Sequence, residues 1–208
     1  EIDAFIADAA LIKTKLEYRQ AERDQGNMDA LSTLLVYSPT TDQPQVPPAS
    51  NVGNVYEFKT NDFAFPYMHL YRAEITTLEC AGAITLQIVQ QDDLSRKLIN
   101  HHTKPSLKWR RAIGVIGRSS DSSGESIYVY SGNEYTVDGL YPTYLKTPAV
   151  FTIGGYIGIN GVARVTTPLD LPDHIHTEVV DLAVQNALGV IALPHEYQVA
   201  QQKTQINQ

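Results

Sequence analysis

The hydrophobic period of this chain changes twice along its length, so no single type of secondary structure accommodates the whole sequence. In residues 2–22, apolar side chains recur at steps of three and four with no intervening glycine or proline, which predicts one long amphipathic helix. The apolar stripe consists of Ile2, Phe5, Ile6, Ala9, Ile12 and Leu16. Gly26 predicts an end to this helix. A shorter second helix is expected from Met28, Leu31, Leu34 and Leu35, which makes residues 1–37 a helical hairpin.

A connection rich in proline, serine, threonine and glutamine follows at residues 38–54. Beyond it, the pattern changes to period two with β-branched residues, which predicts a mainly antiparallel β domain over residues 52–168. Strands are expected at residues 55–59, 68–78, 84–90, 109–116, 127–130, 135–137, 144–151 and 163–167. Residues 92–100 favour a short helix between strands, and the turn at residues 131–133 predicts a tight hairpin joining residues 126–130 to 134–137.

The helical period returns in the last part of the chain, residues 169–208. Asp170 or Asp173 can cap the helix, and Pro172 suits its first turn. Pro194 interrupts the helical run, and a polar, glutamine-rich tail is expected at residues 198–208. The predicted fold class is therefore α+β, with an N-terminal helical hairpin and a C-terminal helix flanking the β domain. We expect the two helical ends to pack as one unit.

Two blocks of the sequence resemble proteins of the head-to-tail neck of crAss-like and related tailed bacteriophages. One is LPDHIHTEVVDLAVQNALG, which follows YPTYLKTPAV after the β-rich stretch, and the other is the opening helix with Ile2-Asp3 and the run LIKTK at residues 11–15. The resemblance implies a structural virion protein that is assembled in the host cytoplasm. It further implies a cyclic, twelvefold ring that contacts the portal protein and neighbouring neck or tail proteins, with genome DNA passing through. It supplies no catalytic residue.

That resemblance suggests which residues lie at subunit or partner contacts. The N-terminal stripe and the start of the C-terminal helix are expected to pack together or onto a neighbouring subunit. The candidate interface residues are Ile2, Phe5, Ala9, Ile12, Leu16, Asp173, His174, His176, Val179 and Leu182. Two polar loops of the β domain, residues 119–124 and 131–133, are candidates for docking an adjoining ring.

Charge is distributed unevenly along the chain. The formal net charge is −7, which argues against a protein that coats nucleic acid along its whole surface. Residues 96–118, however, contain seven lysines and arginines and no acid, with Trp109 among them. The candidate DNA-facing residues in this span are Lys104, Lys108, Arg110 and Arg111. The span could instead face an acidic partner, or it could be a solvated loop and strand edge whose charge is balanced by acids elsewhere in the fold.

The sequence contains no motif that identifies an enzyme. A glycine-rich phosphate loop, a nucleophile elbow and a His-Glu-x-x-His helix are all missing. His101-His102 and the pair His174 and His176 could be imagined as zinc ligands, but residues two apart on a helix point in opposite directions. Cys80 is the only cysteine. We therefore expect no enzymatic activity, no cofactor and no metal. The apolar runs are also too short to cross a bilayer, so no membrane partner is expected.

Tyrosine is abundant, with twelve residues in the chain. Several are close together in sequence, and three interpretations remain open: subunit interfaces, a platform that stacks on sugars, or ordinary packing within the sheet. These residues are Tyr128, Tyr130, Tyr135, Tyr141, Tyr144 and Tyr156. The second interpretation, with Trp109 taking part, gives the alternative function of a carbohydrate-binding or tail-adhesion β module.

Overall fold

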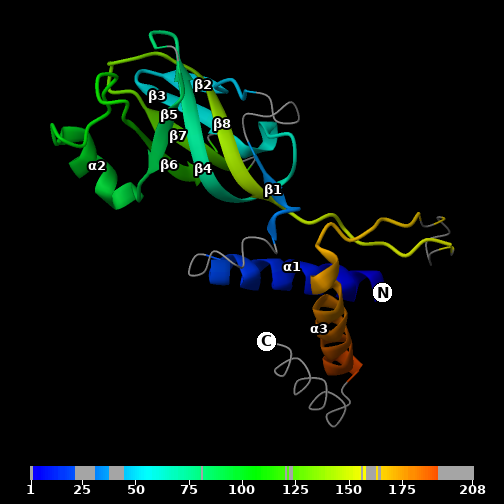
Figure 1. Ribbon diagram of the computed structural model, residues 1–208. Helices are drawn as coiled ribbons and strands as arrows, with labels where there is room; N and C mark the ends of the chain where they lie inside the picture. The colour runs from blue at the N-terminus through cyan, green and yellow to red at the C-terminus, as the bar shows by residue number, and fades with distance from the viewer. Residues whose placement is uncertain are drawn as a thin grey trace. The chain divides into compact units, whose positions relative to one another are not determined.

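A computed structural model shows a chain that divides into two compact units (Figure 1). One unit consists of Glu1–Leu34 together with Thr147–Gln208, and the other of Leu35–Lys146. The structure describes residues 2–21, 31–37, 45–80, 82–119, 121, 124–155, 157, 163 and 165–191. Within these residues, no helix is long and apolar enough to span a membrane.

The unit formed by Leu35–Lys146 is a curled sheet of eight strands with one α-helix. Its strands are β1 (Leu35–Val36), β2 (Ser50–Val52), β3 (Val55–Lys59), β4 (Tyr67–Thr77), β5 (Ile84–Ile88), β6 (Ala112–Arg118), β7 (Glu125–Tyr130) and β8 (Val137–Lys146). The helix α2 (Gln91–Ile99) lies between β5 and β6, and a short 3-10 helix, η2 (Thr60–Asp62), follows β3. The α+β class is confirmed, as are the short helix between strands and most of the predicted strand positions.

The sheet is mixed, which corrects the prediction of a mainly antiparallel β domain. The strand order is β1-β8-β4-β5-β6-β7-β3-β2, and β5 pairs with β6 in parallel through Leu86 and Ala112, among others. A parallel pair needs a crossover connection, and α2 with the loop after it supplies that connection here. Period-two alternation in the sequence is the same for both strand directions, so it could not show this pairing.

The predicted hairpin at residues 126–137 is also wrong. The turn itself is present, with Gly132 and Asn133 at φ of 61° and 64° and with the Glu134 amide donating to the Ser131 carbonyl at 3.1 Å. However, β7 pairs with β3 and β6, whereas β8 pairs with β4 and β1. Both edges of β7 are already paired with β3 and β6. The chain after the turn therefore continues into β8, which lies beside β4 and is not adjacent to β7 in the sheet.

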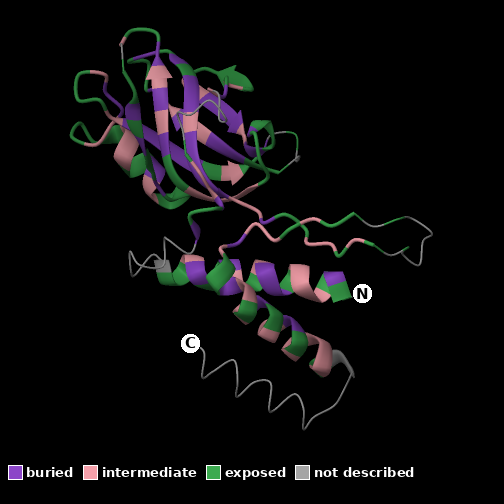
Figure 2. Cartoon of the chain, turned by 45° about the vertical axis from the view of Figure 1, so that its right-hand side comes forward, coloured by how far each residue is buried: buried purple, intermediate pink, exposed green. Residues whose placement is uncertain are grey.

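Buried and less buried positions alternate along the strands (Figure 2), and the buried apolar residues of the β unit form two clusters. On β6, Ala112 joins the main core, whereas Ile113 and Val115 face the other way and join Leu94 of α2. The main core also contains Phe58, Ile75, Ile84, Leu86, Ile127, Val129, Leu140 and Tyr144. The helix α2 therefore covers the outer face of β6, and this packing fixes where the basic loop after α2 begins.

The other unit contains α1 (Ile2–Ala21) and α3 (Asp173–Ile191). The ammonium group of Lys13 on α1 forms ion pairs with Glu17, 2.6 Å away, and with Glu178 on α3. On α3, Ile175, Val179 and Ala183 are buried at steps of four, as the sequence predicts for one face of a helix. Both long helices therefore occur where the periodicity places them.

The second helix of the predicted N-terminal hairpin is not seen in the described residues. Residues 22–30 lie outside the described part, Leu31–Leu34 form a turn, and Leu35 already belongs to β1. The apolar residues Leu31 and Leu34 are buried, and β-pairing of Leu35 with Leu145 replaces the expected helical continuation. The predicted polar tail at residues 198–208 lies outside the described residues.

The predicted unit boundaries also need adjustment. We expected the β domain to span residues 52–168, but the compact β unit is Leu35–Lys146, and Thr147 onward belongs with the helices. The described residues between β8 and α3 form an extended arm, in which Thr152 bridges Thr167 and Ile157 bridges Ala163 (Figure 1). These isolated bridges explain why strand-like residues there do not extend the sheet.

Candidate functional site

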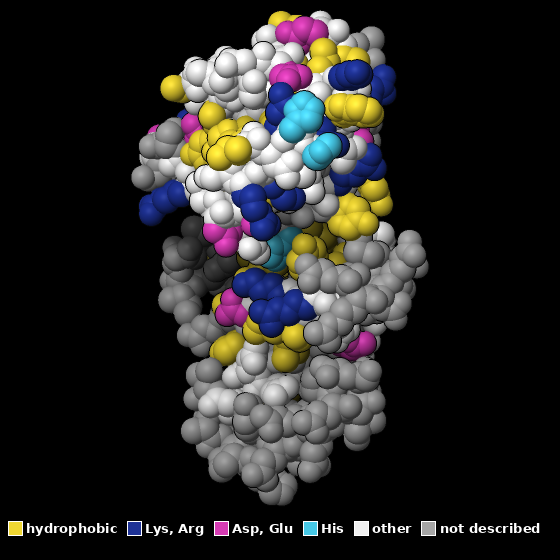
Figure 3. Space-filling view, turned by 90° about the vertical axis from the view of Figure 1, so that its left-hand side faces the viewer, with side chains coloured by type: hydrophobic (Ala, Val, Ile, Leu, Met, Phe, Trp, Pro, Cys, Tyr) yellow, Lys and Arg dark blue, Asp and Glu magenta, His cyan; other side chains and the backbone are white. Residues whose placement is uncertain are grey.

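The basic span is held on the β unit by two apolar anchors. Leu94 of α2 is buried and Leu98 packs beside it against Ile113 and Val115. The chain then turns at Asn100, whose side-chain oxygen accepts a hydrogen bond of 2.9 Å from the His102 amide. Figure 3 shows lysine, arginine and histidine side chains gathered on this face of the β unit, next to exposed hydrophobic ones.

A tight turn follows at residues 106–111. The backbones of Ser106 and Arg111 exchange two hydrogen bonds of 3.0 and 2.9 Å, and the Arg110 amide donates to the Leu107 carbonyl at 3.1 Å. Leu107 packs against the main core. Arg110 has φ of 46°, a left-handed conformation that is uncommon for a residue other than glycine. The turn is therefore anchored on both sides.

The turn presents three consecutive side chains to solvent, Lys108, Trp109 and Arg110, which we call the 108–110 tip. The Trp109 side chain is 68% exposed, and the Lys108 ammonium lies 5.6 Å from the centre of its ring. Among the described residues, neither Lys108 nor Arg110 has an ion-pair partner. An exposed indole between two cations is available for stacking and for contact with anions.

The other two candidate DNA-facing residues have structural partners. The Lys104 ammonium forms an ion pair with Glu134 at 3.2 Å and lines an open pocket of about 350 Å³ with Pro105 and Tyr130. The Arg111 guanidinium donates a hydrogen bond to the His102 carbonyl. The structure thus separates the predicted basic set into two residues at the exposed tip and two that hold the loop.

The histidine pairs do not form a metal site in the part of the chain that the structure describes, where no three histidine, cysteine or acidic side chains are close enough to share an ion. His101 and His102 contact each other edge to face. His176 hydrogen-bonds the Leu171 carbonyl through Nε2 at 2.8 Å, and its Nδ1 lies 3.7 Å from the exposed Asp173 carboxylate. His176 therefore holds the start of α3 against the preceding segment.

The predicted contact residues of the helical unit are found at very different exposures. Ala9 and Val179 are buried, Phe5 and Leu182 are half-buried, and His174 is exposed. Ile2, Ile12 and Leu16 are exposed by 68%, 40% and 36%. The face of α1 that is buried instead carries Asp3, Ala10, Thr14 and Glu17.

Polar contacts are made on this buried face of α1. The Asp3 carboxylate accepts a hydrogen bond of 3.3 Å from the Ile153 amide at the base of the arm, and the buried Thr14 hydroxyl is satisfied within α1 by the Ala10 carbonyl at 2.8 Å. Burial alone lowers the pKa of Lys13, but the hydrogen bonds to Glu17 and Glu178 outweigh it and raise that pKa. Much of the apolar stripe is consequently left facing solvent.

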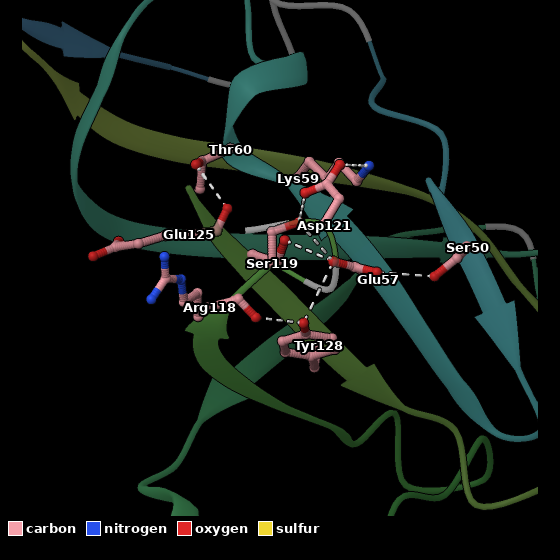
Figure 4. Close-up of polar contacts among 10 residues, drawn as sticks. Ser50, Glu57, Lys59, Thr60, Arg118, Ser119, Asp121, Glu125 and Tyr128 are labelled. Carbon is pink, nitrogen blue, oxygen red and sulfur yellow. Dashed lines mark hydrogen bonds and ion pairs between the residues drawn. The ribbon is translucent and has the colours of Figure 1, made fainter. Parts of the chain in front are cut away.

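A second polar cluster, which the sequence did not suggest, surrounds Glu57 of β3 (Figure 4). The Glu57 side chain is almost fully buried, and its Oε1 accepts hydrogen bonds from Ser126 at 3.0 Å and Ser119 at 3.1 Å. Its Oε2 accepts one from Ser50 at 3.0 Å. The Tyr128 hydroxyl lies 3.4 Å from Oε1, and burial together with the Glu57 charge raises the pKa of Tyr128.

The Glu57 cluster also fixes the start of the loop after β6. The Ser119 hydroxyl lies 2.7 Å from the Asp121 carboxylate, which forms an ion pair with Lys59 at 2.5 Å. The hydrogen bond from the Lys59 ammonium to the Asp121 carboxylate raises the pKa of Lys59.

Two loops were predicted to dock an adjoining ring. Residues 119–124 are described only at Ser119, Asp121 and Gly124, and Ser119 is buried. In the other loop, Gly132 and Asn133 are exposed.

The clustered tyrosines are mainly packing residues where the structure describes them. Tyr135 and Tyr144 are buried, Tyr128, Tyr130 and Tyr141 are half-buried, and Tyr156 lies outside the described residues. Tyr144 contacts Phe63, with ring centres 5.0 Å apart. Trp109 is therefore the most exposed aromatic side chain of the predicted sugar-stacking set among the described residues.

The sequence gives only a weak indication that Glu57 is the centre of a buried polar cluster. It is an acid at an inward position of the strand at residues 55–59, where an apolar side chain would be expected, and two of its partners, Ser119 and Ser126, lie more than 60 positions away.

Comparison with known proteins does not identify a family for this chain. No protein-family model matches it, and no curated protein is significantly similar to it.

Proposed function

We propose that this chain is a structural virion protein, a subunit of a cyclic ring in the neck of a tailed bacteriophage that connects the portal to the tail. The sequence resemblance to neck proteins motivates the proposal. The observation that carries it is the exposure of Ile2, Ile12 and Leu16 on α1, because a helix normally turns its apolar stripe inward. A neighbouring subunit would remove this surface from water.

A ring also needs a second, different surface on each subunit, since cyclic contacts above twofold symmetry are heterologous. The arm between β8 and α3 is a suitable candidate. Val150, Ile157 and Val165 are exposed by 67%, 73% and 79%, and backbone bridges within the arm are isolated. Each copy would place its arm on the α1 stripe of the next copy, and repetition of this contact would close the proposed twelvefold ring.

Two further contacts complete the proposal. The exposed turn at Gly132 and Asn133 is available to an adjoining neck or tail protein. The 108–110 tip would face the genome DNA that passes through the ring, because phosphate contacts require free cations. Assembly in the host cytoplasm and a final place in the virion belong to the same proposal.

Replacing Leu16 with glutamate tests the proposed ring contact. Leu16 is exposed, so the substitution should leave the helix content of the free chain unchanged while placing a charge in the subunit contact. Lys15→Glu, at the neighbouring exposed position, is the control. We expect Leu16→Glu, and not Lys15→Glu, to reduce incorporation into particles about 10-fold or more, which corresponds to about 1.4 kcal/mol. Equal incorporation of the two variants would contradict the contact.

A carbohydrate-binding or tail-adhesion β module is the second candidate, and the exposed Trp109 ring is the observation that favours it. Trp109 is the only tryptophan of the chain, so its fluorescence reports directly on the tip. Titration with neutral glycans from the host surface should leave the spectrum unchanged if the ring proposal holds. A saturable change would favour the adhesion module.

A further inference from the structure

We propose that a pocket of the β unit binds an acidic segment of the adjoining neck or tail protein, with one apolar side chain of that segment in the pocket and a neighbouring carboxylate on the Lys104 ammonium. The inference rests on the proposed function for the presence of an adjoining protein. It goes further in naming the place of the contact and the chemistry of the partner. The pocket has a volume of about 350 Å³, which suits one apolar side chain.

The walls of the pocket are apolar and come from segments that are distant in sequence. They consist of Val55, Leu98, Pro105 and Tyr130. Leu98 and Tyr130 also pack against the buried cluster that α2 forms with β6, so this part of the wall is supported from behind. A rigid apolar hollow with a polar rim is where the energetically dominant side chain of a protein contact usually lies.

The pocket lies directly beside the turn that the proposed function assigns to an adjoining protein. The Ser131 amide donates a hydrogen bond of 3.0 Å to the Asn54 carbonyl, which ties this turn to the turn between β2 and β3. Gly132 lines the pocket, and a Cβ atom at that position would lie 3.7 Å from Pro105. A partner that docks on Gly132 and Asn133 therefore reaches the pocket in the same contact.

The charge around the pocket favours an acidic partner. Lys104 is the only charged residue among the described residues that line the pocket. It belongs to the span of residues 96–118, which contains seven lysines and arginines and no acid. Figure 3 shows these cations gathered on this face of the β unit. Complementary charge selects among partners that offer a similar apolar side chain.

The ion pair of Lys104 with Glu134 leaves room for a second carboxylate. The two groups are 3.2 Å apart, and their side chains are 38% and 34% exposed, which is typical of a weak surface pair. An ammonium group has three donors. The Lys13 ammonium already forms ion pairs with two carboxylates in this chain. A carboxylate of the partner can therefore join Lys104 without displacing Glu134.

Titration of the full ¹⁵N-labelled chain with short peptides tests the pocket by amide chemical shifts. The probe is acetyl-Gly-Phe-Asp-Gly-amide, and in two control peptides serine replaces the phenylalanine or asparagine replaces the aspartate. We expect saturable shifts at Val55, Leu98 and Tyr130 with a Kd on the order of 1 mM. The serine peptide should bind about 10-fold more weakly because no ring is buried, and the asparagine peptide about 3-fold more weakly.

Two substitutions at the ion pair should have opposite effects on binding of the probe. Lys104→Met removes the cation and should weaken binding about 3-fold to 5-fold. Glu134→Gln removes the competing carboxylate and should strengthen binding about 2-fold to 3-fold. Lys108→Met, in the same basic span but outside the pocket lining, is the control and should change the affinity by less than about 1.5-fold. Unchanged amide shifts in α1 and α3 show that each variant is folded.

Several results would overturn the inference. Equal binding of the three peptides would do so, as would weaker binding of the probe by Glu134→Gln. Shifts of the same amides with a short DNA duplex, and none with the probe, would assign Lys104 to the genome instead. A chain that is found at the neck of the particle but does not bind the probe refutes this inference alone. Binding of the probe by a chain that is absent from the neck contradicts the proposed function, whereas the preference of the pocket for an apolar, acidic segment stands.

Discussion

The Ser126 hydroxyl of β7 donates a hydrogen bond of 3.0 Å to Oε1 of Glu57 on the neighbouring strand β3, and both side chains are buried. A buried carboxylate is costly unless donors surround it. Here, hydroxyl groups from β2, β7 and the end of β6 meet on one side chain. The Glu57 cluster therefore ties together parts of the sheet that are distant in sequence.

Replacing Glu57 with glutamine should lower the free energy of unfolding of the β unit by about 1 to 2 kcal/mol, because the amide nitrogen cannot accept a hydrogen bond. Glu125→Gln is the matched control: Glu125 is exposed, and in Figure 4 its side chain points away from the cluster. The control should stay within about 0.5 kcal/mol of the parent protein in urea denaturation. Equal effects of the two substitutions would show that the cluster contributes nothing to stability.

The stability of the β unit should decline above pH 10. Burial raises the pKa of Tyr135 and of Tyr144 above the ordinary value of 10.0. For Tyr144, the hydrogen bond that its phenol oxygen accepts from the Phe65 amide at 3.0 Å offsets only part of the effect. The folded state therefore keeps protons that the unfolded state releases. The contribution is complete below pH 10 and is lost as pH rises through the folded-state pKa values.

Denaturation midpoints measured between pH 8 and pH 11 test this dependence. Tyr135→Phe should flatten the decline, since phenylalanine does not ionise, whereas Tyr71→Phe at a 59% exposed position is the control. A decline of the same slope in Tyr135→Phe and in the parent would show that the buried phenol is not responsible.

Lys13→Met should destabilise the helical unit by about 1 to 2 kcal/mol, because it leaves Glu17 and Glu178 without their shared cation. The pKa of Lys13 is raised in the folded state, so its contribution is complete below about pH 10.5 and lost at higher pH. Amide exchange in α1 and α3 is the measurement, with Lys15→Met as the exposed control. If the stability difference between Lys13→Met and the parent protein grew as the pH rises, the predicted direction of the pH dependence would be contradicted.

Arg110→Gly should leave the stability of the β unit unchanged or increase it by up to about 1 kcal/mol, since glycine adopts a φ of 46° without strain. Arg110→Val should decrease stability, because a β-branched residue is poorly tolerated in that region. Thermal denaturation of the two variants checks the expectation. If both substitutions had the same effect, the left-handed conformation of the turn would not be a constraint.

Local patterns in the sequence were sufficient for the long helices, because α1 and α3 follow the apolar period over about five turns each. They were not sufficient for strand pairing. The turn at Gly132 and Asn133 has hairpin chemistry, yet β8 pairs with β4, and the parallel pairing of β5 and β6 depends on a crossover. These choices are made by long-range packing, which single-sequence patterns do not encode.

The same distinction applies to the candidate site. A run of cations around Trp109 is visible in the sequence, but whether each cation is free depends on partners such as Glu134 for Lys104 and the His102 carbonyl for Arg111. The orientation of α1 similarly involves two contacts that are specific to the tertiary structure, Asp3 with the Ile153 amide and Lys13 with Glu178. Residue types in the sequence therefore predicted where the basic and apolar surfaces lie, whereas tertiary packing decides which of their residues are exposed.

Antibody-gold labelling of intact phage particles that carry this chain, viewed by electron microscopy, tests the proposed function most directly. We predict gold at the single vertex where head and tail meet, with no label elsewhere on the particle. Label at fibre tips, or particles without any label, would contradict the assignment of this chain to the neck ring.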